Sequence, residues 1–230
     1  MGIKVNQETL QMIADLSNAR GASGFEDETV QAAAKHIGEG YTTEEDCLRN
    51  FYMYRTANSG NKPVFMLDAH SDEVGFMVHS IRPNGTLRFV ALGGWNVGSL
   101  ASSKVLVRNS EGKYLPGVIA AKPVHFMSAS EKASAGAADI SSLSIDIGAV
   151  SAKDAAENFK IRIGEPVVPD VTLEYDEEHD LMFGKAFDCR IGCAALIETL
   201  RRLRDEKLDV EVVGVLSSQE EVGERGMKVA

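Results

Sequence analysis

The sequence has few cysteines, no long apolar run and no excess of positive charge, and each of these absences excludes a class of protein. Its three cysteines, Cys47, Cys189 and Cys193, are odd in number and lack the spacing of a disulfide framework, which suits a reducing compartment. No apolar run reaches the length of about 18 residues that a membrane helix needs. The N-terminal segment also lacks the apolar core of a signal peptide. We therefore expect a cytoplasmic protein.

The balance of charge restricts the partners further. The net charge is −10, and both nucleic acid and anionic membranes require a basic face, so neither is expected as a partner. Hydrophobic residues make up 44% of the 230 residues, which is enough to fill the core of one large domain or two small ones.

Apolar spacing predicts an α/β pattern at both ends of the chain. Helices are expected over residues 7–19, 26–37 and 190–205, and strands over 48–56, 63–69 and 210–216. Ser23 and Glu26 have the spacing of a capping box at the start of the second helix. The strand at 63–69 is nearly all apolar and is predicted to be buried on both faces.

The middle of the chain has a different sequence pattern. Short apolar runs alternate with turn signals at 83–85, 93–94 and 109–113, which predicts a module rich in β-hairpins. Residues 127–140 are expected to form a flexible loop, and a short helix should follow at 151–159 with Ser151 as its cap. The sequence thus predicts an α/β domain, residues 1–74 and 172–230, interrupted by a β-rich domain at 75–171.

Two polar residues follow the apolar strand at 63–69. His70 and Asp72 are two positions apart in an extended segment and therefore project to the same side. A metal-binding histidine usually has a carboxylate that orients it, so this pair is a candidate metal site. An ordinary loop at the end of a strand is the alternative.

Asp188 precedes the third helix, where free N–H groups favour a carboxylate. It is either a simple N-cap or a ligand whose two oxygens bridge two cations about 3.5–4 Å apart. Cys189 and Cys193 are one helical turn apart, but no CxxC pair or suitable histidine accompanies them. We assign them to the core or to support of the site.

Glu220 and Glu221 directly follow the strand at 210–216. Adjacent carboxylates point in different directions, so one can bind a metal while the other accepts a proton from an activated water and delivers it to a leaving amine. A solvated acidic turn is the alternative.

The motifs AHSDEVGFMV, GKAFDCRIGC and SSQEEVGERG, in this order, resemble those of the dinuclear metalloaminopeptidases of the tetrahedral (TET) type. The segments GASGFEDE and LSIDIGAVSAKDA extend the resemblance over nearly the whole chain. The resemblance implies an α/β sandwich of the phosphorylase/hydrolase type that is interrupted by a β-barrel-like dimerisation domain. It implies that His70 binds one metal, Asp188 bridges two and Glu221 binds the other. Glu220 would be the general base, and Asp72 would orient His70. The implied metals are zinc or cobalt, the substrates are peptides that lose N-terminal residues, and members assemble from dimers into dodecamers.

Two departures from the family pattern affect the expected activity. Cys189 stands where the family commonly has a second aspartate. The family also continues beyond the length of this chain and there supplies a further aspartate and histidine ligand. We therefore expect an incomplete metal-ligand set in this C-terminally incomplete α/β domain, from either a fragment or a truncated gene product.

Two other functions remain open. The chain could be an inactive subunit that acts in assembly. Because some relatives carry an endoglucanase label, a glycoside hydrolase is the third possibility. That chemistry needs two opposed carboxylates about 5–10 Å apart, which neighbouring residues on one segment supply poorly.

Overall fold

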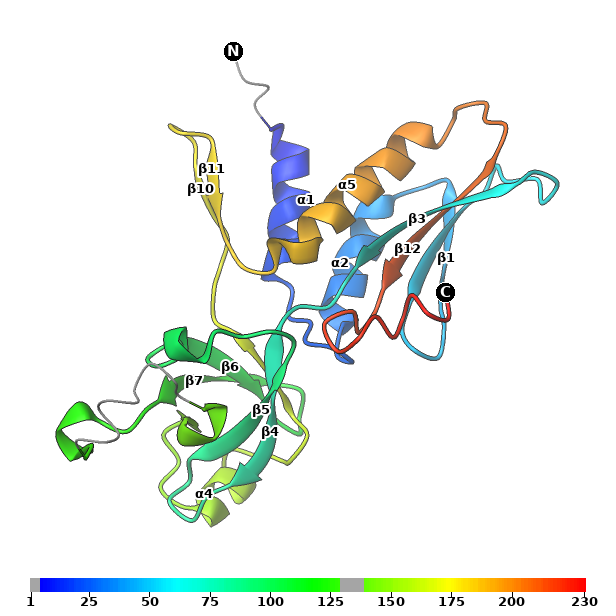
Figure 1. The fold of residues 1–230 in the computed structure, drawn as a ribbon. Helices are drawn as coiled ribbons and strands as arrows, with labels where there is room; N and C mark the ends of the chain where they lie inside the picture. Colours follow the sequence, from blue (N-terminus) through cyan, green and yellow to red (C-terminus); the bar gives the residue numbers. More distant parts are fainter. Residues whose placement is uncertain (1–4, 129–138) are drawn as a thin grey trace. The chain divides into compact units, whose positions relative to one another are not determined.

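The chain folds into two compact units. The computed structural model describes residues 5–128 and 139–230 (Figure 1). Met1–Glu73 and Val171–Ala230 together form one unit, which we call the α/β unit. Val74–Asp170 form the other, the barrel unit. All five predicted site residues belong to the α/β unit.

A four-stranded mixed sheet is the framework of the α/β unit. Its strands follow the order β1-β2-β12-β3, with the bounds Tyr41–Glu45 for β1, Phe51–Arg55 for β2, Val64–His70 for β3 and Glu211–Ser217 for β12. β12 is parallel to β3 and antiparallel to β2, which also pairs antiparallel with β1. Strand β1 was not predicted, because its sequence is polar and mostly exposed and carries no apolar alternation.

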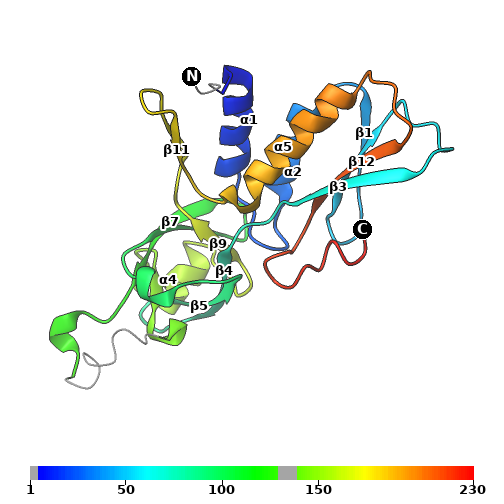
Figure 2. The same ribbon diagram turned by 45° about the horizontal axis from the view of Figure 1, so that its top comes forward.

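Three helices cover one face of this sheet (Figures 1 and 2). They are α1 (Gln7–Asn18), α2 (Asp27–Ile37) and α5 (Phe187–Leu203). All three had been predicted from their apolar spacing. Their buried side chains form one core with the sheet, and it includes Met12, Leu16, Val30, Phe51, Met53, Ile197, Leu200 and Leu216. Each such side chain contributes about 1.5–3 kcal/mol when fully buried, so this core fixes the start of α5 relative to the strand ends.

Strand β3 lies at the edge of the sheet, and the prediction that it is buried on both faces is wrong. Val64 and Phe65 are 65% and 55% exposed, and only Ala69 of this strand is buried. The interior position belongs to β12, in which every residue is buried. Both strands are apolar runs, and their neighbours come from distant parts of the chain. Composition alone therefore did not distinguish the edge strand from the interior one.

The start of α2 also differs from the prediction. Glu26 is the N-cap residue, but its side chain makes no capping hydrogen bond. The Ser23 hydroxyl donates to the carboxylate of Asp72 instead of capping the helix. The predicted capping box is therefore absent, because both side chains have partners elsewhere in the α/β unit.

The barrel unit is a closed barrel of six strands in the order β4-β5-β8-β7-β6-β9. Their bounds are Gly75–Ile81, Leu87–Leu92, Ser144–Asp146, Tyr114–Ala120, Lys104–Arg108 and Pro166–Pro169, in that order around the barrel. The predicted turns at 83–85 and 109–113 join β4 to β5 and β6 to β7. Its core includes Phe76, Val78, Leu87, Phe89, Val105 and Ile145. The predicted class, a mixed α/β fold with a barrel-like insertion, is confirmed.

The remaining elements are short. Helix α4 (Ala152–Glu157) begins as predicted after Ser151, whose hydroxyl accepts a hydrogen bond from the backbone N–H of Asp154 at 3.1 Å. The others are η1 (Val97–Ser99), η2 (Val124–Phe126), η4 (Ile140–Ser142), β10 (Glu174–Asp176) and β11 (Leu181–Phe183). The predicted flexible loop at 127–140 lies mostly outside the described residues. Within the described part of the chain, no helix is long and apolar enough to cross a membrane.

Candidate metal centre

The predicted site residues meet at one edge of the sheet in the α/β unit. Strands β3 and β12 are parallel, and His70 is in register with Ser217. The two segments that follow these strands therefore lie side by side (Figure 1). This is the edge, beyond the carboxyl ends of parallel strands, at which open α/β sheets usually bind ligands.

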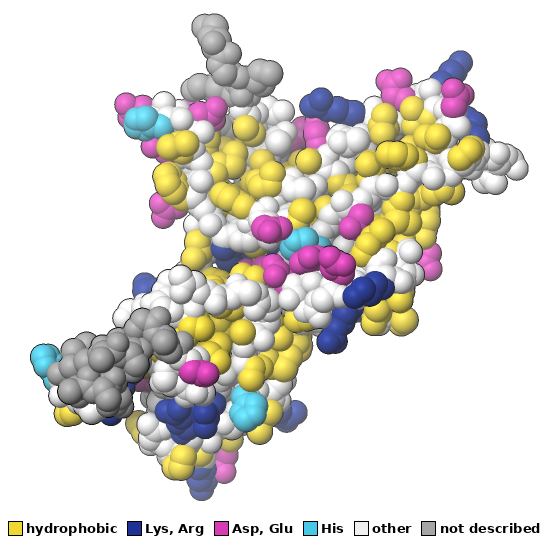
Figure 3. Space-filling model, in the orientation of Figure 1, with side chains coloured by type: hydrophobic (Ala, Val, Ile, Leu, Met, Phe, Trp, Pro, Cys, Tyr) yellow, Lys and Arg dark blue, Asp and Glu magenta, His cyan; other side chains and the backbone are white. Residues whose placement is uncertain are grey.

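His70 is at the centre of the group. Its Nε2 lies 3.0 Å from Asp188 Oδ1 and 3.9 Å from Glu220 Oε2. Its Nδ1 lies 3.2 Å from the backbone oxygen of Asp72 and 3.5 Å from Oδ1 of that residue. The Cys193 thiol donates to the backbone oxygen of His70 at 3.1 Å. The structure thus brings together the histidine and the carboxylates that the motifs predict, and acidic side chains surround a histidine on the face seen in Figure 3.

The surroundings of His70 favour its charged form. Burial lowers its pKa, but the neighbouring carboxylates, with Asp72 first among them, outweigh burial and raise the pKa to about 9. The imidazole is therefore protonated at neutral pH when no cation is bound. A cation that binds Nε2 must displace this proton.

Asp72 is fully buried and connects three segments of the α/β unit. Its Oδ2 accepts from the Ser23 hydroxyl at 2.6 Å and from the backbone N–H of Glu221 at 3.2 Å. Its Oδ1 accepts from the backbone N–H of Glu220 at 2.9 Å. Burial acts to raise the pKa of Asp72, but these donors and His70 prevail and lower it. A buried carboxylate with this many donors stays ionised.

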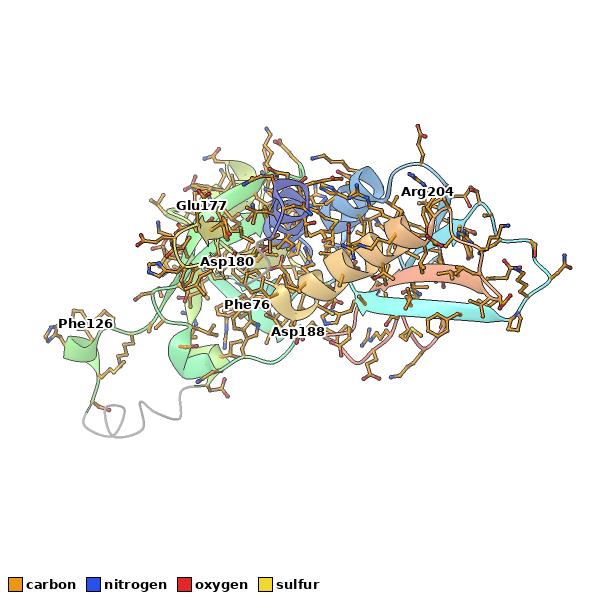
Figure 4. All side chains as sticks on the ribbon, turned by 90° about the horizontal axis from the view of Figure 1, so that it is seen from above. Phe76, Phe126, Glu177, Asp180, Asp188 and Arg204 are labelled. Carbon is orange, nitrogen blue, oxygen red and sulfur yellow. The ribbon has the colours of Figure 1, made fainter. Side chains whose placement is uncertain are left out.

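Asp188 lies at the start of α5 (Figure 4). The N-cap of this helix is Ala186, and the Asp188 carboxylate contacts His70, so the interpretation of Asp188 as a simple N-cap is wrong. The backbone of Asp188 is not helical (φ −83°, ψ 109°). The carboxylate is 90% exposed and reaches His70. Both of its oxygens are therefore accessible to a ligand. The peptide between Asp188 and Cys189 is cis.

The donor atoms fall into two groups that share His70. One group is His70, Asp188 and Cys189, and the other is His70, Glu220 and Glu221; within each, the donor atoms lie within 4.8 Å of one another. Zinc binds nitrogen and oxygen at about 2.0–2.2 Å, so donors within this span can converge on one cation after small side-chain movements. A cavity of about 410 Å³ opens beside them and is lined in part by His70, Cys189 and Glu220. Imidazole and carboxylate donors beside a cavity fit a divalent cation.

Burial and the negative charge of Asp72 raise the pKa of Glu221, against the opposing effect of the His70 charge. The side chain of Glu220 is 40% exposed. Its backbone is held by Asp72, while its carboxylate remains free to face the cavity.

A buried ionic cluster, which the motif analysis missed, holds the start of α5 in place. Lys185 Nζ donates to Glu73 Oε1 at 2.5 Å and to the backbone oxygen of Ala19 at 3.2 Å. Arg190 Nη1 donates to the backbone oxygens of Leu16 and Ala19. Burial lowers the pKa of Lys185, and the charge of Glu73 opposes this effect. The cluster anchors the segments on both sides of Asp188 to the end of α1. In the sequence, the only signal for this cluster was the presence of a lysine and an arginine on either side of Asp188.

Ser23, Glu26 and Asn50 were also missed as parts of the site. The Glu26 side chain is fully buried and accepts from the backbone N–H of Gln219 at 3.2 Å. Asn50, also fully buried, accepts from the N–H of Ser218 at 3.0 Å and donates to the backbone oxygen of Gly226. The SGFE motif was visible in the sequence, but a local capping box accounts for the same residues. Only the fold shows that they reach the strand ends.

With this geometry in view, comparison with known proteins gives the family. Residues 50–230 match the M42 glutamyl aminopeptidase family. The chain is 33% identical over 224 residues to the glutamyl aminopeptidase of Lactococcus lactis subsp. cremoris (strain MG1363), which covers 97% of this chain and 62% of that relative. The chain belongs to the M42 glutamyl aminopeptidase family, and the resemblance seen in the motifs is confirmed.

Solved structures agree with this assignment. The TET aminopeptidase from the marine sediment archaeon Thaumarchaeota archaeon SCGC AB-539-E09 is similar with a TM-score of 0.88 at 33% identity, over 96% of this chain and 61% of that one. The TET1 peptidase of Pyrococcus horikoshii, which can assemble into a tetrahedron or a large octahedral shell, has a TM-score of 0.84 at 27% identity, over 96% and 64% of the two chains. The chain spans about three-fifths of the length of these relatives.

Proposed function

We propose that the complete protein is a metal-dependent aminopeptidase that removes N-terminal residues from peptides. The observation that carries this proposal is the convergence of Asp188, Glu220 and Glu221 on His70 beside a cavity. Membership of the M42 family supports the same reaction. A solvated acidic turn, the alternative for Glu220 and Glu221, accounts for neither the convergence nor the buried Asp72 beneath it.

In this proposal the donors divide between two divalent cations. His70 would hold one, Asp188 would be shared by the two, and Glu221 would hold the other, with zinc or cobalt as the metal. When bound, these cations supply Lewis-acid activation of a water molecule and of the scissile carbonyl. Asp72 keeps the His70 ring oriented through the contacts at Nδ1, so that Nε2 remains directed at the other donors.

Glu220 is the general base of the proposed reaction. Its carboxylate takes a proton from the attacking water and passes it to the leaving amine of the peptide. Three features suit it to this role: its side chain is partly exposed, it lines the cavity, and its backbone N–H is fixed by Asp72. A base held at its backbone keeps its position while its side chain rotates toward the substrate.

The test compares two neighbouring glutamates in the full-length protein. Glu220→Gln should retain bound metal and lower turnover by at least about 10²-fold, because it removes the proton acceptor. Glu221→Gln should instead weaken metal binding. The measurements are release of N-terminal amino acids from peptides, with and without a chelator, and metal content of the purified protein.

Glu198→Gln serves as the control, since Glu198 lies on α5, pairs with Arg201 and Arg202, and belongs neither to a donor group nor to the cavity lining. Full turnover in Glu220→Gln, or peptide cleavage that survives complete metal removal, would reject the mechanism. An oligomer that binds no metal and cleaves no peptide would favour the alternative of an inactive assembly subunit.

We also propose that the protein forms homo-oligomers, from dimers to dodecamers, through its barrel unit. The support is the P. horikoshii relative, which assembles into closed shells. Large apolar side chains are exposed on the barrel unit, among them Val150 at 81% and Ile163 at 70%. Exposed apolar side chains of this size are favoured at contacts between subunits.

A further inference from the structure

The segment Ser23–Glu26 meets the candidate metal centre from a distant part of the chain. Glu26 is fully buried, yet its side chain makes no capping hydrogen bond to the helix that it precedes. Its Oε1 accepts from the backbone N–H of Gly24 at 2.8 Å and from that of Gln219 at 3.2 Å. Ser23 is also buried, and its hydroxyl donates to Asp72. Glu26 thus contacts the turn that carries Glu220 and Glu221 directly, and Ser23 contacts the carboxylate of Asp72 that holds this turn.

Three successive amides of that turn are held by two buried carboxyl groups. The N–H of Gln219 donates to Glu26, and the N–H groups of Glu220 and Glu221 donate to the two oxygens of Asp72. Consecutive backbone N–H groups that point to one side form a concavity that binds anions. Here the carboxyl groups of the protein itself fill that concavity.

The backbone of the turn depends on these contacts. Gln219 has a φ of 54°, in the left-handed region that residues with a side chain seldom adopt. Such a conformation persists only where surrounding contacts determine it. Its amide has Glu26 as its acceptor, and the next two amides have Asp72, which Ser23 in turn fixes. The conformation that directs Glu220 and Glu221 toward His70 is therefore maintained from the N-terminal segment.

We infer that Ser23 and Glu26 are positioning residues for the proposed peptidase reaction, because they hold the Gln219–Glu221 turn in the conformation that presents the general base and one metal ligand. This inference rests on the proposed function for its catalytic consequence. The positioning itself is a property of the fold and can be measured separately.

Both protonation states of Glu26 keep Oε1 as a hydrogen-bond acceptor. Its Oε2 is buried and has no hydrogen-bond partner in the described part of the chain. Burial raises the pKa of Glu26 to about 7, the nearby charge of Asp72 acts in the same direction, and the backbone N–H groups oppose them. A neutral side chain with one acceptor at the Oε1 position should therefore serve almost as well. Glutamine meets this requirement and leucine does not.

The experiment uses the full-length protein with the variants Glu26→Gln, Glu26→Leu and Ser23→Ala. Glu28→Gln is the matched control, since Glu28 lies in the first turn of α2 and pairs with Arg20 instead of the turn. Hydrogen exchange of the peptide covering 217–226 reports the turn directly. Values of kcat and KM, together with zinc affinity, report its consequence at the site.

In Glu26→Leu the amides of 219–221 should exchange about 10-fold faster, because a buried hydrogen bond is lost. Its kcat or zinc affinity should fall about 10- to 100-fold, as for other residues that orient a metal site, while KM stays unchanged. Glu26→Gln should behave like the parent protein, and Ser23→Ala should speed exchange at Glu220 and Glu221. Glu28→Gln should change none of these quantities.

Unchanged exchange in a folded Glu26→Leu, or equal damage from Glu26→Gln, would overturn the inference. If Glu26→Leu does not fold, the Ser23→Ala variant provides the test. The inference is also overturned if the amides of Glu220 and Glu221 exchange in Ser23→Ala at the same rate as in the parent protein. A parent protein that cleaves no peptide would reject the proposed function instead, and the exchange measurements would still confirm or overturn the positioning role.

Discussion

Asp72 shows how one side chain organises the candidate metal centre. Its motif position next to His70 predicts contact with the imidazole, and the structure has that contact. The same carboxylate also holds the backbone of Glu220 and Glu221 and accepts from Ser23. Loss of Asp72 would therefore affect the histidine and the turn together, which makes it a poor probe of either one. Glu26 bonds to the turn and to the nearby Gly24 but not to His70, so it is the cleaner probe of the turn.

Glu26 also gives a prediction about stability and pH. Its pKa is about 7 in the folded protein and 4.5 in its ordinary state. Between these values the folded protein holds a proton that the unfolded chain has lost, so stability must fall as the pH rises through this window. The free energy of unfolding of the parent, relative to Glu26→Gln, should decrease by about 3 kcal/mol from pH 4.5 to pH 7.5.

Urea unfolding of both proteins at several pH values measures this difference. The other titrating groups are common to the two proteins and cancel in the comparison. A difference that stays constant, or that grows as the pH rises, would contradict the burial of an ionisable carboxyl at this position.

At the scale of elements, the turn after β12 positions the site residues as much as the strands do. The turn begins at Ser218 and closes at Gly226, whose backbone N–H donates to the backbone oxygen of Ser218 at 3.0 Å. Asn50, the last residue of the loop between β1 and β2, joins the two ends by bonding to both. Sequence patterns predict strands and helices well, but this turn is defined by contacts with two distant segments.

Gly226 tests how tightly the turn closes. A Cβ atom at this position would lie 2.2 Å from Asn50 Oδ1 and 2.4 Å from the backbone oxygen of Ser218. Gly226→Ala should therefore displace the turn and lower the free energy of unfolding by about 1–3 kcal/mol. Peptidase turnover should fall as well, since Glu220 and Glu221 move with the turn.

Gly94→Ala is the matched control, because a Cβ atom there meets nothing within 4 Å. Denaturant unfolding and peptide cleavage of both variants are the measurements. Equal stability of the two variants would show that the turn accommodates the added methyl group, and so would contradict the close packing around Asn50.

At the scale of the whole molecule, the proposed assembly depends on the surface of the barrel unit. Val150→Asp and Ile163→Asp each place a charge on an exposed apolar position and should dissociate the oligomer into smaller species. Ala156→Asp, which adds a charge on α4 without removing a large apolar side chain, is the control and should leave the assembly unchanged. Sedimentation velocity of the three variants measures the outcome. If the oligomer keeps its size in both Val150→Asp and Ile163→Asp, the interface between subunits does not include these positions.

Much of the fold could be predicted from local pattern. The apolar spacing of α1, α2 and α5 and the turns at 83–85 and 109–113 are local signals, and the structure confirms them. Strand β1 carried no such signal, and the edge position of β3 could not be inferred from its apolar composition. Ser23 and Glu26 were assigned to a helix cap because local spacing says nothing about a carboxylate 49 residues away.

What the sequence by itself determined is the set of chemical groups and their order along the chain. His70, Asp72, Asp188, Glu220 and Glu221 follow from motifs, because a residue type and its place after an apolar strand are properties of the chain alone. Their convergence was decided by the parallel pairing of β3 with β12 and by the packing of α5 on the sheet. Long-range contacts of this kind depend on which apolar surfaces fit together, and local sequence does not specify that fit. The tertiary structure alone therefore decided that a serine and a glutamate near the N-terminus hold the turn of Glu220 and Glu221 in place.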